Sequence, residues 1–136
     1  MAKLTVELVT PERHVLAEED VDVVVAPGID GELAVLPNHA PLVTELSPGV
    51  VVLRRGGDED ILAVSGGFLE VLGDTVTVLA DTSERSDEID LERAQAARDR
   101  ALESMSLTMT PTEVLEARIR LLRALARIRA ANRRSG

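Results

Sequence analysis

Arginine is the residue type whose spacing in this chain most clearly suggests chemistry. The last twenty residues hold seven arginines and no acidic residue. Four of these arginines follow a spacing of i, i+3, i+7 and i+14, so they share one face of a helix: Arg120, Arg123, Arg127 and Arg134. Arg93 and Arg100 are seven residues apart and share a face of a preceding helix in the same way.

Clustered guanidinium groups suit anionic ligands, because their planar fork matches phosphate and carboxylate groups. Like charges at these spacings repel one another and weaken an unliganded helix. Three interpretations remain open: a solvated basic face, a site for a phosphate-bearing ligand, and contact with an acidic protein surface. Nucleic acid is disfavoured, because the chain has one aromatic residue, Phe68, for stacking on bases, and its first 83 residues are strongly acidic.

The remaining chemistry-bearing residues predict no catalytic residue and no metal ligand. The two histidines, His14 and His39, are far apart in sequence, and the chain has no cysteine. No nucleophile elbow, Walker A loop or zinc-binding helix motif is present. The acidic runs at 18–19 and 58–60 are expected in loops as solvated charge. Gly66-Gly67 is too short to cradle a phosphate and indicates a hairpin bend.

The first eighty residues have the alternation and turn signals of short β-strands. Strands are expected at 3–9, 21–26, 33–36, 42–46, 50–54, 61–64, 68–72 and 75–79, with a further extended piece beginning at 15–16. Gly73-Asp74 is a pair typical of tight hairpin turns. Short strands at this regular spacing predict an antiparallel β-sandwich or flattened barrel.

From residue 89 the pattern changes to the period of helices. A first helix is expected at about 89–105 and a second at about 111–132, joined by the short link 106–109. Thr110-Pro111-Thr112-Glu113 combines a capping box with proline at the first helical position, which is a specific start signal. Two helices with so short a link form an antiparallel hairpin. The domains are therefore expected at 1–83 and 84–136, with a polar link at 81–88.

Composition places the chain among globular proteins with an aliphatic core. Its 136 residues are 45% hydrophobic, and the net charge is −9. That charge is segregated: residues 1–83 hold 4 basic and 15 acidic side chains, whereas residues 84–136 hold 11 basic and 9 acidic ones. The sequence contains neither a long apolar run nor a signal-peptide core, so a cytoplasmic protein is expected.

The segment 31–49 is unusually rich in turn-forming residues. It contains three prolines and two glycines between short apolar runs. Proline fixes φ and glycine permits positive φ, so a tightly turned connection is expected. Such a connection suits either a demanding corner of a sandwich or a shaped binding surface.

Three blocks of sequence resemble the epsilon subunit of bacterial and chloroplast F-type ATP synthases: Gly31-Glu32-Leu33 with residues 36–42, residues 65–71, and residues 76–80. The resemblance covers the whole chain, including the order of β domain and helical hairpin. It implies a ten-stranded β-sandwich, or flattened barrel, followed by an antiparallel two-helix hairpin.

The resemblance implies a non-catalytic subunit of the central stalk that couples proton flow to rotation and restrains ATP hydrolysis. The β domain would bind the gamma subunit and rest on the ring of c subunits, with Glu32 and His39 in the segment that faces the c-ring. The extended hairpin would run toward acidic segments of the catalytic beta subunits. Membrane association would occur only through the complex, at the cytoplasmic face of the bacterial plasma membrane.

Some members of this family bind ATP through the motif Ile/Leu-Asp-x-x-Arg-Ala, which residues 89–94 match in full. The resemblance implies an ATP-binding set, with ATP as a regulatory ligand rather than a required cofactor: Glu84, Ile89, Asp90, Arg93, Ala94, Arg100, Arg123 and Arg127. In this interpretation the carboxylates accept hydrogen bonds from adenine or ribose, the apolar side chains line the base, and the arginines face the phosphates. A structural stalk subunit that binds no nucleotide is the alternative.

Overall fold

A computed structural model describes residues 2–107 and 109–135, with side chains up to residue 133. Thr108 in the predicted link and the side chain of Arg134, in the predicted arginine face, lie outside the described residues. The elements are β1 (Leu4–Val9), β2 (His14–Val21), β3 (Val23–Gly28), β4 (Gly31–Val35), β5 (Leu42–Arg55), β6 (Asp58–Leu72), β7 (Thr75–Ala80), β8 (Ser83–Arg85), a 3-10 turn (Ser86–Glu88), α1 (Leu91–Ser104) and α2 (Pro111–Ser135).

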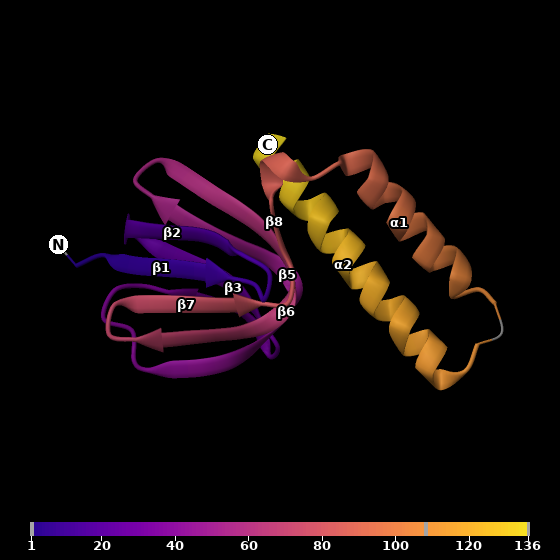
Figure 1. Cartoon of the computed structure of the whole chain (residues 1–136), viewed down its shortest axis with the longest axis horizontal. Coiled ribbons are helices and arrows are strands. Elements are labelled where there is room, and N and C mark those ends of the chain that lie inside the picture. Colours follow the sequence, from indigo (N-terminus) through magenta and orange to yellow (C-terminus); the bar gives the residue numbers. More distant parts are fainter. Residues whose placement is uncertain (1, 108, 136) are drawn as a thin grey trace.

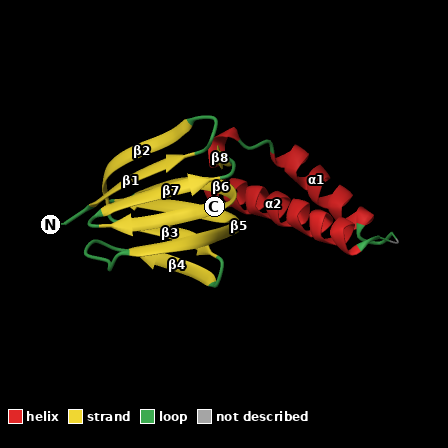
Figure 2. Cartoon of the chain, turned by 60° about the horizontal axis from the view of Figure 1, so that its bottom comes forward, coloured by secondary structure: helices red, strands yellow, loops and turns green. Residues whose placement is uncertain are grey.

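The predicted class, a β-sandwich followed by a two-helix hairpin, is confirmed (Figure 1). The strands form one sheet in the order β2-β1-β7-β6-β5-β3-β4, with β8 paired to β6, and this sheet folds over into two layers (Figure 2). The pairs are antiparallel except β1 with β7, which is parallel. Alternate side chains of each strand point between the layers, as the period of two requires.

The predicted count of ten strands is wrong, because the described residues form eight. β5 and β6 are 14 and 15 residues long, and each runs unbroken through a corner where two strands were expected. The first half of β6 pairs with β8 and its second half with β7, so the strand changes layer along its length. Counting the halves of the two long strands separately recovers ten segments.

Gly66-Gly67 forms the corner of β6 rather than the predicted hairpin bend. Both residues have positive φ, +116° and +129°. A Cβ atom on Gly67 would lie 2.0 Å from the backbone oxygen of Leu79, so the paired strand β7 leaves no room for a side chain. The strand can therefore turn between layers while it keeps its pairing on both sides.

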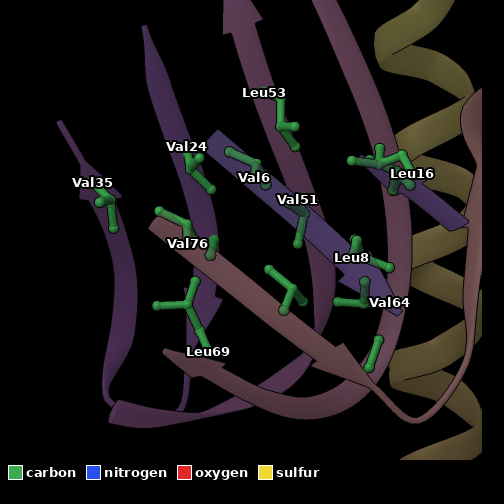
Figure 3. Close-up of a cluster of buried hydrophobic side chains, with 14 of the residues drawn as sticks. Val6, Leu8, Leu16, Val24, Val35, Val51, Leu53, Val64, Leu69 and Val76 are labelled. Carbon is green, nitrogen blue, oxygen red and sulfur yellow. The ribbon is translucent and has the colours of Figure 1, made fainter. Parts of the chain in front are cut away.

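The main hydrophobic core lies between the two layers of the sandwich (Figure 3). It is built almost wholly from valine and leucine, and its buried members extend from Leu4 to Ala80. No described residue of the hairpin belongs to this core. The sandwich therefore carries its own packing, and the hairpin is added to its outer surface.

The helices start where side chains can satisfy the exposed N–H groups. Asp90 caps α1, since its carboxylate accepts a hydrogen bond from the backbone N–H of Arg93 at 3.1 Å. Consequently α1 begins at Leu91, two residues later than predicted. α2 begins at Pro111 as predicted, with both 3.2 Å hydrogen bonds of the Thr110–Glu113 capping box in place. It continues to Ser135, three residues beyond the predicted end.

α2 lies against β5 and β6, and α1 lies on the outer side of α2 (Figure 1). The helices meet through small buried residues, Ala94 and Ala101 on α1 and Ala117 and Ala124 on α2. A second, smaller cluster joins hairpin to sandwich, and we call it the interdomain joint. Its buried members are Ile61, Ala63, Ile89, Ala130 and Ala131.

Candidate functional site

A hollow of about 380 Å³, which we call the outer hollow, opens between the two helices. The alanines of the helix contact form its floor, because their side chains stop short of filling the space. Arginines and one serine form its walls. Its lining residues are Ala97, Arg100, Ala101 and Ser104 from α1, and Arg120, Arg123, Ala124 and Arg127 from α2.

A second hollow of about 210 Å³, the inner hollow, lies between α2 and the sandwich. It is lined by Ala63, Val64 and Ser65 of β6, by Thr82 and Glu84 at β8, and by Arg123 and Arg127 of α2. Arg123 and Arg127 line both hollows. The two hollows therefore adjoin at these arginines, and together they touch both helices and the sandwich.

Polar contacts concentrate at the sandwich end of this pair of hollows. Arg127 Nε lies 2.7 Å from Glu84 Oε1, an ion pair between two partly buried side chains. The buried Nε–H has no acceptor in line, so this contact is an ion pair rather than an aligned hydrogen bond. Next to it, the Thr82 hydroxyl donates to Ser65 Oγ at 2.6 Å, and the Thr82 N–H donates to the same oxygen at 2.9 Å.

Four of the eight residues predicted to bind ATP line these hollows: Glu84, Arg100, Arg123 and Arg127. Glu84 lies in β8, a strand that the sequence did not predict. The structure brings these side chains together from three elements that are far apart in the chain. Arg93 is exposed, one helical turn before Ala97 and on the same face of α1.

The other three predicted residues have structural contacts of their own. Ile89 is 6% exposed and belongs to the interdomain joint. Asp90 caps α1, and Ala94 is fully buried in the helix contact. The structure therefore does not bring these three side chains to either hollow.

The predicted ATP-binding set omits four polar residues that line the hollows: Arg120, Ser104, Ser65 and Thr82. The spacing of the arginines on α2 already pointed to Arg120. No comparable signal marked Ser65 and Thr82, which are 17 residues apart and meet only through the folding of the sheet.

The acidic runs at 18–19 and 58–60 lie in strands, so their placement in loops was wrong. Arg54 Nε donates to Glu59 Oε2 at 2.9 Å, and Arg133 Nη2 from the end of α2 donates to the same oxygen at 3.2 Å. The hydrogen bond from Arg133 lowers the pKa of Glu59 most, and the hydrogen bond from Arg54 lowers it further. Glu59 therefore ties the last turns of α2 to the sandwich.

A further arginine, Arg55, pairs with two other residues of these acidic runs. Arg55 lies 3.5 Å from Glu18 and 3.3 Å from Asp60, across β2, β5 and β6. Arg55 therefore has two anionic partners, and this group of charges keeps a net negative charge on the sandwich surface.

The two predicted c-ring contacts lie toward opposite ends of β4. Glu32, the second residue of this strand, is exposed and lines a hollow of about 580 Å³ beside the end of α2. His39 follows the far end of the strand, where its Nδ1 lies 2.7 Å from the carbonyl oxygen of Ala40. The preceding residue, Asn38, has φ +68° and donates its N–H to Asp74 at 2.8 Å. The structure does not bring Glu32 and His39 together.

The part of the chain that the structure describes contains no group of three or more histidine or carboxylate side chains placed to hold a metal ion. Neither α1 nor α2, within their described residues, combines the length and apolar composition needed to cross a bilayer.

Comparison with protein families accounts for the chain from residue 3 to residue 132. Residues 3–86 match the family described as "ATP synthase, Delta/Epsilon chain, beta-sandwich domain". Residues 87–132 match "ATP synthase, Delta/Epsilon chain, long alpha-helix domain".

Curated relatives agree with the family match over nearly their whole length. The ATP synthase epsilon chain of Dehalococcoides mccartyi (strain CBDB1) is 51% identical over 98% of this chain and 96% of the relative. The ATP synthase epsilon chain of Moorella thermoacetica is 52% identical over 96% of this chain and 98% of the relative.

Solved structures show the same architecture. A chain of the Euglena gracilis mitochondrial ATP synthase, OSCP/F1/c-ring in rotational state 1, aligns with a TM-score of 0.84 and 25% identity, covering 97% of this chain and 82% of that one. A chain of the Tetrahymena thermophila mitochondrial ATP synthase central stalk and c-ring, 17% identical, shares the fold with a TM-score of 0.67, covering 96% of this chain and 97% of that one. The chain therefore belongs to the family of ATP synthase epsilon chains, which are non-catalytic subunits of the central stalk.

Proposed function

We propose that this subunit couples proton flow to rotation and restrains ATP hydrolysis through a mobile hairpin that binds ATP in its docked arrangement. The sandwich would bind the gamma subunit and rest on the c-ring through Glu32 and His39. The complex would hold the subunit at the cytoplasmic face of the bacterial plasma membrane. The relatives named as epsilon chains and the alignment to an F1/c-ring assembly support this role.

One observation carries the ATP-binding part of the proposal: Arg123 and Arg127 line both the outer and the inner hollow. A nucleotide seated along these hollows would contact α1, α2 and the sandwich at once. Undocking α2 would remove the inner hollow entirely. The ligand would therefore bind the docked arrangement better than the undocked one and shift the population toward it.

Charge supports an anionic ligand at this site. Within the described part of the chain, Arg100, Arg120 and Arg123 form no ion pair, and Arg127 has one, with Glu84. Guanidinium groups around one hollow repel each other, and a polyphosphate would relieve this repulsion. ATP would act as a regulatory ligand, with no cofactor required.

The interdomain joint supports a mobile hairpin. Three of its five buried members are alanines, so separating the hairpin from the sandwich exposes little apolar area. The arginine-rich α2 would then be attracted to carboxylates of the catalytic beta subunits, an attraction that salt weakens. This undocked state would be the inhibitory one.

Isothermal titration of the full chain with ATP, with and without Mg²⁺, tests nucleotide binding. Replacing Arg123 and Arg127 by Ala should weaken ATP binding at least tenfold, since charge-assisted hydrogen bonds to phosphate are lost. Arg118→Ala is the matched control, because Arg118 is exposed on α2 and lines neither hollow. Absence of heat up to millimolar ATP would leave the alternative, a structural stalk subunit that binds no nucleotide.

Disulfide cross-linking tests the contact with the rotor. The chain has no cysteine, so Glu32→Cys and His39→Cys each introduce a single reactive group. Both variants should cross-link to a cysteine in the exposed loop of a c subunit within the assembled complex. Glu19→Cys, an exposed position on β2, is the control. Equal cross-linking at all three positions would contradict the assigned contact.

A further inference from the structure

Arg120 occupies a distinct position among the arginines of the outer hollow. It lies outside the motif at 89–94, and it is not part of the predicted ATP-binding set, which includes Arg123 and Arg127. α2 runs from the hairpin tip toward the sandwich, and Arg127 pairs with Glu84 at the sandwich end (Figure 1). At a rise of about 1.5 Å per residue, Arg120 lies roughly 10 Å farther out along the helix axis.

The polar groups that line the hollows differ between the sandwich end and the outer end. At the sandwich end, the carboxylate of Glu84 and the hydroxyls of Ser65 and Thr82 line the inner hollow. A carboxylate repels phosphate but accepts hydrogen bonds from the hydroxyl and amino groups of a nucleoside. This end therefore suits the base and sugar of a nucleotide.

The outer end has the opposite character. Arg100 and Arg120 face it from the two helices, Ser104 adds a hydroxyl, and the lining residues that the structure describes include no carboxylate. The alanine floor leaves the guanidinium groups accessible, because Ala97, Ala101 and Ala124 are too short to cover them. This end suits the most highly charged part of a polyphosphate.

We infer that a nucleotide lies along the hollows with its phosphates outward, and that Arg120 contacts the terminal phosphate and so selects triphosphate over diphosphate. The inference rests on the ATP binding proposed above. Arg123 and Arg127, which line both hollows, would contact the inner phosphates that ATP and ADP share. Arg120 would meet only the phosphate that ADP lacks.

The test is isothermal titration of the full chain and its Arg120→Ala variant with ATP and with ADP. The substitution should weaken ATP binding about tenfold or more, the effect of one lost charge-assisted contact, and leave ADP binding within about twofold. Arg123→Ala should weaken both nucleotides. Arg118→Ala, two residues away on another face of α2, controls for the loss of net charge and should change neither affinity.

The outcomes separate this inference from the proposed function. If Arg120→Ala leaves ATP binding unchanged, or weakens ATP and ADP equally, the role of Arg120 is overturned while ATP binding stands. If the unmodified chain binds neither nucleotide, the proposed function fails and this inference fails with it. The assignment is supported if Arg120→Ala loses the preference for ATP over ADP while Arg118→Ala keeps it.

Discussion

Gly67 is the residue on which the corner of β6 depends. Its backbone sits at φ +129°, a region that side-chain-bearing residues avoid, and a Cβ there would point into the backbone of the paired strand β7. Two penalties therefore act on any substitution here, one from backbone strain and one from overlap with the carbonyl group of Leu79.

We predict that Gly67→Ala lowers the free energy of unfolding by about 3 kcal/mol or more, because strain and steric overlap add. Gly57→Ala is the control, since a Cβ there meets nothing within 4 Å and φ is not positive. Urea denaturation of both variants measures the difference. Similar stability of the two variants would contradict the assigned role of the corner.

Recognising such corners from sequence alone is difficult, and Gly66-Gly67 illustrates why. Gly73-Asp74 was predicted as a tight turn, and the structure has a turn there between β6 and β7. Both pairs contain glycine within two residues of an apolar run, and the local sequence does not distinguish a chain reversal from a bend in a continuing strand. That outcome depends on the pairing with β7, because the carbonyl oxygen of Leu79 lies where a Cβ of residue 67 would be.

At the scale of elements, the sequence predicts where α2 begins, but it does not predict where α2 docks on the sandwich. The start is local, since Thr110, Pro111 and Glu113 cap the helix among themselves. Docking depends on β6 residues some seventy positions earlier, including Glu59, which pairs with Arg133. Spacing on a helix predicts which arginines share a face, but not which face meets the sheet.

The ion pair of Glu59 makes the docking of α2 depend on pH. Arg133 and Arg54 lower the pKa of Glu59, so the docked state holds this proton less tightly than the undocked state. The stabilisation is present above the ordinary glutamate pKa of about 4.3. It is lost as the pH falls through the lowered value.

We predict that Glu59→Gln reduces hydrogen-exchange protection of the last turns of α2 at neutral pH by roughly twofold to fivefold, as expected for a partly exposed ion pair. Asp58→Asn, at an exposed neighbouring position, should leave protection unchanged. The difference between Glu59→Gln and the unmodified chain should shrink as the pH falls through the lowered pKa of Glu59, because Glu59 then becomes neutral as well. Equal protection at neutral pH would contradict the contact.

The helix contact offers a second prediction at this scale. Ala124 is 2% exposed and forms part of the floor of the outer hollow. Ala124→Leu should push the helices apart, cost about 1–3 kcal/mol of stability and fill the space proposed for nucleotide. Ala96→Leu, at an exposed position of α1, should be close to neutral. Thermal unfolding measures both, and an unchanged melting temperature for Ala124→Leu would show that the helices do not pack closely there.

At the scale of the whole molecule, the sandwich and the hairpin have separate packing. The buried core of the sandwich extends from Leu4 to Ala80, and its described members include none from the helices. The sequence indicated this division through its change from period two to helical period, and through its charge. What it could not indicate is the interdomain joint, because Ile61 looks like an ordinary core residue and Ile89 belongs to the motif that predicts a contact with the base of ATP.

We predict that residues 1–88 alone fold cooperatively. Removing the hairpin exposes the sandwich side of the interdomain joint, chiefly Ile61 and Ala63, with Val50 beside them. The expected loss is about 2–3 kcal/mol, the cost of returning a few aliphatic side chains to water. Chemical denaturation followed by circular dichroism measures it. A gradual, non-cooperative transition would show that the hairpin is part of the folding unit.

The long strands β5 and β6 have a mechanical consequence for a subunit of the central stalk. Their thirteen register pairs continue through the corners, so a force applied at one end of the sandwich travels along covalent backbone into both layers. Under a force along the strands, the hydrogen bonds between them share the load in shear rather than break one after another. We therefore expect the sandwich to resist stretching along these strands more than its alanine-rich connection with the hairpin resists separation.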